Sequence, residues 1–344
     1  MIIFSDLHLR ERSEFVCFEI LDEIEMLAQS DPDGRVVCCG DFWHIRYQLS
    51  VRLLNRVAQM LQRWSEKEIL LDIVPGNHDQ VDVNGRNALE VFEGFAGVCV
   101  WSEPGVEDSG DFGYVPYRKD PQQQKAELDA VVEAVNDGAI ICGHGGVHGA
   151  VMNNGRKNAD DGLERDEVSS LPGGIRLVLG HYHKPQVGPY YQYVGSPYQT
   201  NYGEAGNEEL GYLQLVGSEL RRIESEVAAP QHYILKWDPG TGDPPPHPGR
   251  EIDHVRLDIV ATQEMIISGK FKTALKKHGL QDAQVNVVPV SVERDHRFAM
   301  QKGESLVDAA RRFVAERMHT DEQGAVQQSE DESRELLAVL EGWL

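Results

Sequence analysis

Short apolar segments recur through the first half of the sequence, and each ends in a turn that carries a polar residue. In chain order the segments read MIIFS, RVVCCG, ILLDIVPG, GAIICGH and IRLVLGH. Their length and their many β-branched residues are typical of buried strands. Asp, Asn or His stands where each strand is expected to end. Open α/β sheets build their binding sites at the carboxyl ends of strands, so this pattern predicts a site there.

Helical segments lie between several of these strands. Residues 50–68 and 14–29 both have apolar side chains at helical spacing. In the first of them the apolar residues fall on one face: Leu53, Val57, Met60, Leu61 and Trp64. Strands that alternate with amphipathic helices predict an α/β layered domain, which we place at residues 1–236.

The remainder of the chain has a different organisation. Residues 237–251 are rich in proline and glycine and are expected to form a linker. A strand–helix–strand pattern follows and predicts a small α+β capping domain at residues 252–300. Residues 301–344 predict C-terminal helices, the last with an apolar stripe that suits docking on a partner protein. Such a helix can equally pack on its own domain, so both placements stay open.

Length, charge and composition limit the functional classes. The 344 residues exceed what one compact core usually holds, which favours more than one domain. The formal net charge of −23 disfavours a chain that binds nucleic acid without a partner, because cations supply most of that affinity. No apolar run is long enough to cross a membrane and no leader precedes MIIFSDLHL, so we expect a cytoplasmic protein. The cysteines show no CxxC spacing and are expected to be reduced thiols.

Five motifs carry side chains that can bind metal ions. They are Asp6-x-His8, Asp41-x-x-His44, Asn77-His78-Asp79, His144 in GH, and His181-x-His183 in GHYH. Each motif alone is a weak signal, since a single histidine near a strand is more often a buried hydrogen-bonding residue. The complete set, with each motif at an expected strand end, makes coincidence a poor explanation.

The chemistry of these side chains is consistent. Carboxylate, amide and imidazole ligands together suit hard and borderline divalent ions such as Mn²⁺. Hydrolysis of a phosphate ester needs an activated water and neutralised phosphoryl oxygens, and two metal ions about 3.5–4 Å apart supply both. A carboxylate can bridge two such ions, and Asp41 is best placed for this in the motif order. The motifs therefore predict a two-metal phosphoesterase.

In these motifs the sequence resembles the calcineurin-like metallophosphoesterase superfamily. The resemblance implies an α/β layered sandwich of two mixed sheets flanked by helices. It implies a first metal ion held by Asp6, His8, Asp41 and His183. It implies a second metal ion held by Asp41, Asn77, His144 and His181. All these positions carry the expected residue types.

The surroundings of the motifs resemble one branch of that superfamily. Phosphoprotein phosphatases carry GD-x-x-DRG, whereas His44, Ile45 and Arg46 stand here. The histidine is similar to that of the SbcD and meiotic-recombination-eleven nucleases. FGYVPYRKD at residues 112–120 and the segment YVGSPYQTNYGEAGNEELGYLQL also resemble these nucleases. The short loop after SDLHL and the small second domain look closest to the phage versions.

The resemblance implies roles for several further residues. His78 would protonate the leaving sugar oxygen or stabilise the transition state, and His44 would orient it. A hydrogen bond that fixes a metal ligand is a comparable alternative for His44. Asp79 is expected to brace its loop, and Tyr198 and Tyr202 to pack rather than to stack on bases. Cations near the motif loops are expected to contact DNA phosphates, although surface decoration explains any one of them as well: Arg10, Arg12, Arg46, Arg118 and Lys184.

The leading interpretation is a Mn²⁺-dependent DNA exonuclease or endonuclease, the nuclease subunit of an SbcCD-like complex for repair and recombination of double-strand breaks. Mg²⁺, Fe²⁺ and Zn²⁺ are alternatives to Mn²⁺. The resemblance implies an SbcC-like ATPase of the SMC family as partner, and a homodimer. The alternative is a phosphatase or small-molecule phosphodiesterase that acts alone, which agrees better with the acidic charge. An inactive scaffold is disfavoured because no predicted ligand is lost.

Overall fold

The computed structural model describes residues 1–44, 48–82, 86–159, 162–169, 171–261 and 271–289. The chain divides into two units, Met1–Val288 and Pro289–Leu344, and the second lies almost wholly outside the described ranges. The helices predicted within residues 301–344, and Arg46, therefore lie outside the described residues. Among the described helices, none is long and apolar enough to span a bilayer.

Two six-stranded sheets form the first part of the chain. The first sheet has, in spatial order, β12 (Glu219–Glu224), β11 (Gly211–Val216), β1 (Ile2–Phe4), β2 (Arg35–Cys38), β3 (Leu70–Ile73) and β4 (Val98–Val100). Strands β1 to β4 run parallel, and β11 is antiparallel to β1. Parallel neighbours end at the same edge of the sheet, so the loops that follow β1, β2 and β3 come together.

The second sheet is mixed in the same way. It contains, in spatial order, β5 (Gly105–Val106), β6 (Phe112–Val115), β7 (Ile140–His144), β8 (Arg176–Gly180), β10 (Tyr191–Tyr193) and β9 (Gln186–Val187). Strands β6, β7, β8 and β10 are parallel neighbours, while β5 and β9 are antiparallel edges. All five predicted strands are confirmed as β1, β2, β3, β7 and β8.

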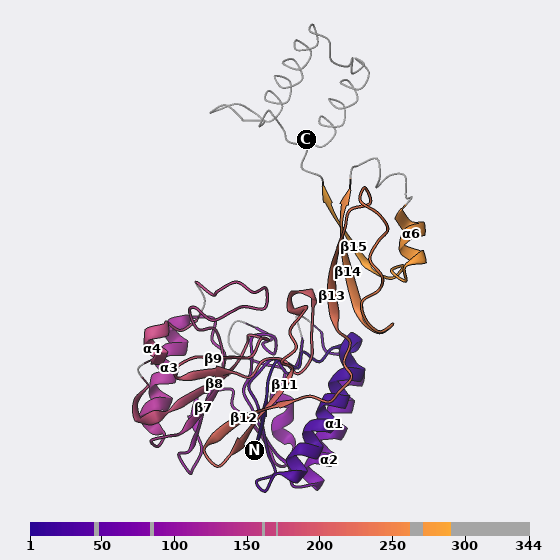
Figure 1. The fold of residues 1–344 in the computed structure, drawn as a ribbon. Helices are drawn as coiled ribbons and strands as arrows, with labels where there is room; N and C mark the ends of the chain where they lie inside the picture. The colour runs from indigo at the N-terminus through magenta and orange to yellow at the C-terminus, as the bar shows by residue number, and fades with distance from the viewer. Residues whose placement is uncertain (45–47, 83–85, 160–161, 170, 262–270, 290–344) are drawn as a thin grey trace, which may run out of the picture. The chain divides into compact units, whose positions relative to one another are not determined.

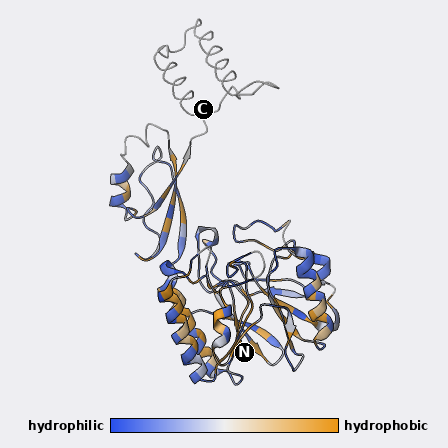
Figure 2. Cartoon of the chain, turned by 180° about the vertical axis from the view of Figure 1, so that it is seen from behind, coloured by the Kyte–Doolittle hydropathy of each residue, from blue (hydrophilic) through white to orange (hydrophobic). Residues whose placement is uncertain are grey.

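Helices cover the outer faces of the two sheets (Figure 1). The helices are α1 (Glu14–Ser30), α2 (Val51–Glu66), α3 (Pro121–Ala134) and α4 (Arg165–Ser169). Helices α1 and α2 lie on one side of the sandwich, and α3 and α4 lie on the other. Each helix carries both hydrophobic and hydrophilic residues (Figure 2). The five apolar residues predicted to share one face of α2 are all buried, which confirms that prediction.

Three apolar clusters hold these layers together. The first lies between the first sheet and helices α1 and α2, and it includes Phe4, Ile24 and Trp64. The second lies between the other sheet and helices α3 and α4. The third lies between the two sheets, where Ile3 of β1 and Cys142 of β7 share one cluster. The predicted sandwich of two mixed sheets flanked by helices is confirmed.

A separate three-stranded sheet follows. It contains β13 (His232–Trp237), β14 (His254–Ala261) and β15 (Gln284–Pro289), with helix α6 (Phe271–Lys277) between the last two strands. Strands β13 and β14 are parallel neighbours. The proline- and glycine-rich residues 238–253 therefore connect two strands of one sheet. We expected residues 237–251 to link two domains, but the small sheet begins before them, because β13 pairs with β14 across that segment.

Candidate metal centre

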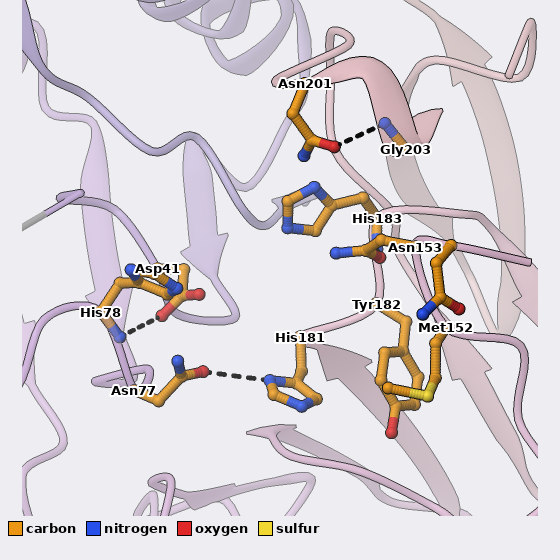
Figure 3. Close-up of a pocket in the computed structure, with 11 residues that line it drawn as sticks. Asp41, Asn77, His78, Met152, Asn153, His181, Tyr182, His183, Asn201 and Gly203 are labelled. Atoms are coloured by element: carbon orange, nitrogen blue, oxygen red, sulfur yellow. Dashed lines mark hydrogen bonds between the residues drawn. The ribbon is translucent and has the colours of Figure 1, made fainter. Parts of the chain in front are cut away.

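Polar side chains from both sheets meet at the carboxyl ends of the parallel strands. Asp6 follows β1, Asp41 follows β2 and Asn77 follows β3 in the first sheet. His144 ends β7 and His181 follows β8 in the second sheet. Figure 3 shows the consequence, since Asp41, Asn77 and His78 face His181 and His183 across a pocket of about 290 Å³.

The backbone at these positions is strained. Positive φ angles occur at Asp6 (54°), His8 (48°), Asp41 (53°) and His181 (102°), and Glu68 is the one other described non-glycine residue with such an angle. The left-handed region costs side-chain-bearing residues about 1–2 kcal/mol. Strain of this kind persists only where the surrounding structure fixes it, and here it aims side chains at one point.

Two glycines allow the strand ends to approach one another. A Cβ atom on Gly180 would lie 1.9 Å from the Ser5 hydroxyl and 2.1 Å from the Cys39 carbonyl oxygen. A Cβ atom on Gly40, where φ is +89°, would lie 2.4 Å from His144 Nδ1. Any larger residue at either position would push the two sheets apart at the site.

The first predicted ligand group is brought together. His8 Nε2 lies 3.0 Å from His183 Nε2 and 3.6 Å from Asp41 Oδ2. His183 Nε2 lies 3.7 Å from Asp6 Oδ1. Donor atoms of Asp6, His8 and His183 all lie within 4.8 Å of one another. These buried side chains form a set of donors that could hold one metal ion.

The second predicted ligand group lies beside the first. Asn77 Oδ1 is 3.0 Å from His181 Nδ1 and 3.2 Å from His144 Nε2. His144 Nε2 is in turn 3.5 Å from Asp41 Oδ1. The two carboxylate oxygens of Asp41 thus face different groups, Oδ1 the second and Oδ2 the first. This is the geometry that a bridging carboxylate requires.

Neighbouring acceptors hold two of the histidine rings. His144 Nδ1 lies 2.8 Å from the carbonyl oxygen of Cys39, to which it donates. His183 Nδ1 lies 2.6 Å from Glu204 Oε1. A ring held through Nδ1 presents Nε2 as a lone pair toward the cluster. Such partners orient the ligands of metal sites and raise their basicity.

The pKa shifts in the cluster indicate that a bound cation would stabilise it. Burial raises the pKa of Asp6, and burial together with the carboxylates of Asp6 and Asp79 raises the pKa of Asp41 well above its usual value. Burial and neighbouring histidines lower the pKa values of His8 and His144 well below theirs. The negative charges of Asp6 and Asp41 are therefore costly in this buried site. Divalent ions bound among the carboxylates would offset that cost. The donor set fits a centre of two divalent ions.

Two buried carboxylates support this centre without belonging to it. Asp79 accepts hydrogen bonds from the backbone N–H groups of Trp43 (2.8 Å) and Gly76 (2.9 Å), which confirms the predicted brace. Glu204 was not predicted from the sequence. It accepts from Thr200 Oγ1 (2.6 Å) and holds His183. It lies in the segment YGEAGNEEL, and no residue pattern there distinguishes it from the neighbouring glutamates.

His44 and His78 adjoin the first ligand group. His44 Nδ1 lies 3.0 Å from His8 Nδ1, so His44 contacts a predicted ligand on the side away from the cluster. The ring of His44 also stacks on that of His78, with centroids 4.7 Å apart and planes 16° apart. His78 lines the pocket and its backbone N–H donates to Asp41 Oδ1 at 2.8 Å. Both roles that the sequence leaves open for His44 agree with these contacts.

The predicted DNA-contacting cations have different surroundings. Arg12 and Lys184 are exposed, and Arg10 is half-buried and donates to the carbonyl oxygen of Thr200 at 3.1 Å. Arg118 is 9% exposed and forms ion pairs with Glu127 and Glu103. Its surroundings therefore favour an internal brace over the predicted phosphate contact.

Two sheets whose strand ends gather carboxylate, amide and imidazole donors define a metal-dependent hydrolase of phosphate esters. The calcineurin-like phosphoesterase family matches residues 1–207, and the chain belongs to that family. Among solved structures, the chain is similar to a dimetal phosphatase from Danio rerio (LOC 393393). The identity is 11% over 62% of this chain and 90% of that one, with a TM-score of 0.32, so this likeness carries no argument about substrate. No curated protein matches the sequence.

Proposed function

We propose that the chain is a Mn²⁺-dependent DNA nuclease, the catalytic subunit of an SbcCD-like complex that processes double-strand breaks. The observation that carries the proposal is the imidazole pair of His44 and His78, stacked beside the metal centre. A sugar alkoxide is a poor leaving group, so cleavage of DNA gains much from an imidazole that can donate a proton. Phosphoprotein phosphatases of the superfamily have the aspartate of DRG where His44 stands.

The residues of this chain have separable tasks in such a reaction. Two divalent ions, when bound, neutralise the phosphoryl oxygens and activate water. His78 lies at the pocket and donates a proton to the leaving oxygen. His44 stacks on its ring and bonds His8, so it couples the orientation of the acid to that of a metal ligand. The side-chain amides of Asn153 and Asn154 line the same pocket and offer hydrogen bonds to the phosphate.

The charge of the pocket also supports a diester as substrate. Among the described residues that line it, none is lysine or arginine. A phosphomonoester carries about −1.5 to −2 charges near neutral pH, whereas a diester carries one. Beyond the two ions, the described lining offers no side-chain cation to balance a second charge, which favours the diester.

The net charge of the chain favours a second candidate function. If the chain is a nuclease, the same charge favours a partner protein that holds the DNA. At −23, the chain is poorly suited to hold a duplex by itself, which agrees with a phosphatase or small-molecule phosphodiesterase that acts alone. For the nuclease we therefore propose an SbcC-like coiled-coil ATPase that holds the duplex, and a homodimer of this chain. Residues 301–344, which we expect to dock that partner, lie outside the described residues.

The test compares DNA with a phosphomonoester. End-labelled duplex and single-stranded DNA are incubated with Mn²⁺ and the full chain, alongside p-nitrophenyl phosphate. The variants are Asp41→Ala and His78→Ala, with His247→Ala as a matched control because His247 lies outside the metal-centre pocket. We expect the wild type and the control to cleave DNA, and the two variants to lose at least about 100-fold in rate.

A second substrate tests whether His78 acts as the proton donor. The p-nitrophenolate group leaves without protonation, so His78→Ala should lose less activity on bis(p-nitrophenyl) phosphate than on DNA. Asp41→Ala should lose activity on both, because it removes the carboxylate that faces both ligand groups. If DNA stays intact even with the ATPase partner present, while the phosphomonoester is hydrolysed rapidly, the nuclease proposal is contradicted. That result would favour the phosphatase or small-molecule phosphodiesterase.

A further inference from the structure

A second pocket of about 350 Å³ lies between the loops at the strand ends of the sandwich and the small sheet. Its lining comes from three parts of the chain: Arg10 and Arg12 after β1, residues 198–202 before β11, and the strands of the small sheet. Asn201 lines both this pocket and the metal-centre pocket, so the two adjoin. We call it the cationic pocket, for the reason that follows.

The charge of this pocket is opposite to that of the chain. Its described lining includes Arg10 and Arg12 but no aspartate or glutamate, although the chain has 56 acidic residues. Within the described part of the chain, neither arginine forms an ion pair with a carboxylate. Arg10 donates to the Thr200 carbonyl oxygen, yet its buried Nε has no hydrogen-bond partner. Two cations without counter-ions mark a place for an anion.

A buried histidine adds a second polar atom without a hydrogen-bond partner. His232 of β13 lines the cationic pocket, is 9% exposed and has an Nδ1 atom without a hydrogen-bond partner. Burial, together with the nearby His254, Arg12 and Arg10, lowers the pKa of His232 to about 4. The ring is thus neutral near neutral pH and offers one N–H donor. Buried polar atoms are usually satisfied, so an unsatisfied one beside two arginines points to a missing ligand.

The two tyrosines of the pocket already have packing partners. The ring of Tyr202 has His232 edge-on at 4.9 Å and the Arg256 guanidinium 5.7 Å from its centroid. Tyr198 is buried and donates to the carbonyl oxygen of Leu7 at 3.1 Å. Both tyrosines make packing contacts, as predicted. A phosphate contact suits the cationic pocket better than a base contact does.

We propose that the cationic pocket binds a second phosphate of the DNA strand whose scissile phosphate lies at the metal centre. This inference rests on the proposed nuclease function. A guanidinium can bind two oxygens of one phosphate at once through parallel hydrogen bonds. The Arg12 side chain is exposed and can turn toward such a phosphate. The side-chain amide of the exposed Gln284 adds a neutral donor. The enzyme therefore selects substrates that carry at least two phosphates on one strand, which a small diester lacks.

The test measures this selection with the full chain and Mn²⁺. Arg12→Gln and His232→Gln are compared with the wild type on a single-stranded oligonucleotide and on bis(p-nitrophenyl) phosphate. Arg165→Gln is the matched control, because Arg165 is exposed at the start of α4 and lines neither pocket. We expect Arg12→Gln to lower the ratio of the two kcat/KM values about tenfold, the effect of one charge-assisted hydrogen bond. For Arg12→Gln, the slope of log kcat/KM on the oligonucleotide against log salt concentration should become shallower by about one.

The outcomes separate this inference from the function on which it rests. If Arg12→Gln keeps the wild-type ratio and salt dependence while DNA is cleaved, the subsite is refuted and the nuclease stands. If the wild type hydrolyses only the small diester, both ideas fall. Inorganic phosphate provides a further comparison as an inhibitor of small-diester hydrolysis. Weaker inhibition of Arg12→Gln with unchanged oligonucleotide cleavage would assign the pocket to free phosphate and overturn the strand contact.

Discussion

Side chains outside the ligand set hold the histidines of the metal centre in place. Glu204 holds the ring of His183 and itself accepts from Thr200, and the Cys39 carbonyl oxygen holds His144. A ring fixed at one nitrogen needs no reorientation to bind a metal through the other. At the scale of single residues, the orientation of a predicted ligand therefore depends on a glutamate that is not one of the predicted ligands.

Glu204→Gln should weaken Mn²⁺ binding about 10- to 100-fold, because the amide removes the negative charge behind His183. Calorimetric titration of the metal-free protein measures the affinity directly. Glu219→Gln is the matched control, since Glu219 is exposed on β12. Wild-type affinity in Glu204→Gln would show that the charge of Glu204 is not needed to position His183.

His232 should make the protein less stable in acid. Its pKa is about 4 in the folded state against an ordinary value of 6.5, so the unfolded state binds more protons between these values. Stability is therefore lost as the pH falls below 6.5. Between pH 7 and pH 5 the loss is about 1–2 kcal/mol after allowance for solvent screening. Urea unfolding should show an acid-induced loss that is smaller by about this amount in His232→Gln than in the wild type and in His247→Gln, since His8 and His144, whose pKa values are also lowered, still contribute.

Helix α2 packs on the sandwich through an apolar stripe, and its arginines also form ion pairs with Glu14 and Glu25 of α1. Val57, Leu61 and Trp64 are buried in the cluster beneath it, while Gln59 of the same helix is exposed. Helices of this length gain most of their stability from packing rather than from propensity. The stripe therefore decides whether the outer layer stays on the first sheet.

Leu61→Ala should lower the free energy of unfolding by about 2–5 kcal/mol, since it removes buried methyl groups and leaves a cavity. Gln59→Ala, on the exposed face, should change it by less than about 0.5 kcal/mol. Urea unfolding curves of both variants provide the measurement. Equal effects at the two positions would contradict the packing of α2 in the structure.

At the scale of the whole molecule, the candidate metal centre lies where the two six-stranded sheets meet. Asp6, Asp41 and Asn77 come from the first sheet, and His144 and His181 come from the second. In the layer between these sheets an apolar cluster packs beside polar contacts, such as the hydrogen bond from Arg35 of β2 to the Tyr114 hydroxyl of β6 (2.8 Å). Ions bound at the strand ends would therefore cross-link the sandwich and relieve the burial of its carboxylates.

Mn²⁺ should stabilise the folded chain by about 2.7 kcal/mol at 100 times its dissociation constant. Thermal unfolding with and without EDTA measures the shift in midpoint. Asp41→Asn should abolish most of the shift, because it removes the carboxylate that faces both ligand groups. A midpoint that does not respond to Mn²⁺ in the wild type would contradict a metal centre in this cluster.

Much of the fold and of the centre could be read from residue order. Strand and helix periods are local, and the turn after each strand carries its polar residue whatever the rest of the chain does. Parallel strands bring these turns to one edge, and the resemblance to the calcineurin-like superfamily named the seven predicted ligands among their side chains. The small sheet was placed less well, because the pairing of β13 with β14 spans a proline- and glycine-rich segment that gives no sign of it.

The sequence by itself determined which elements form and which side chains stand at their ends, because both follow from near-neighbour spacing. Only the tertiary structure decided that Glu204 holds His183, that Arg118 is paired with Glu127, and that Arg10 and Arg12 share a pocket with His232. Those partners lie on elements far apart along the chain. Their contact depends on how the layers pack, and no local pattern of residues encodes that packing.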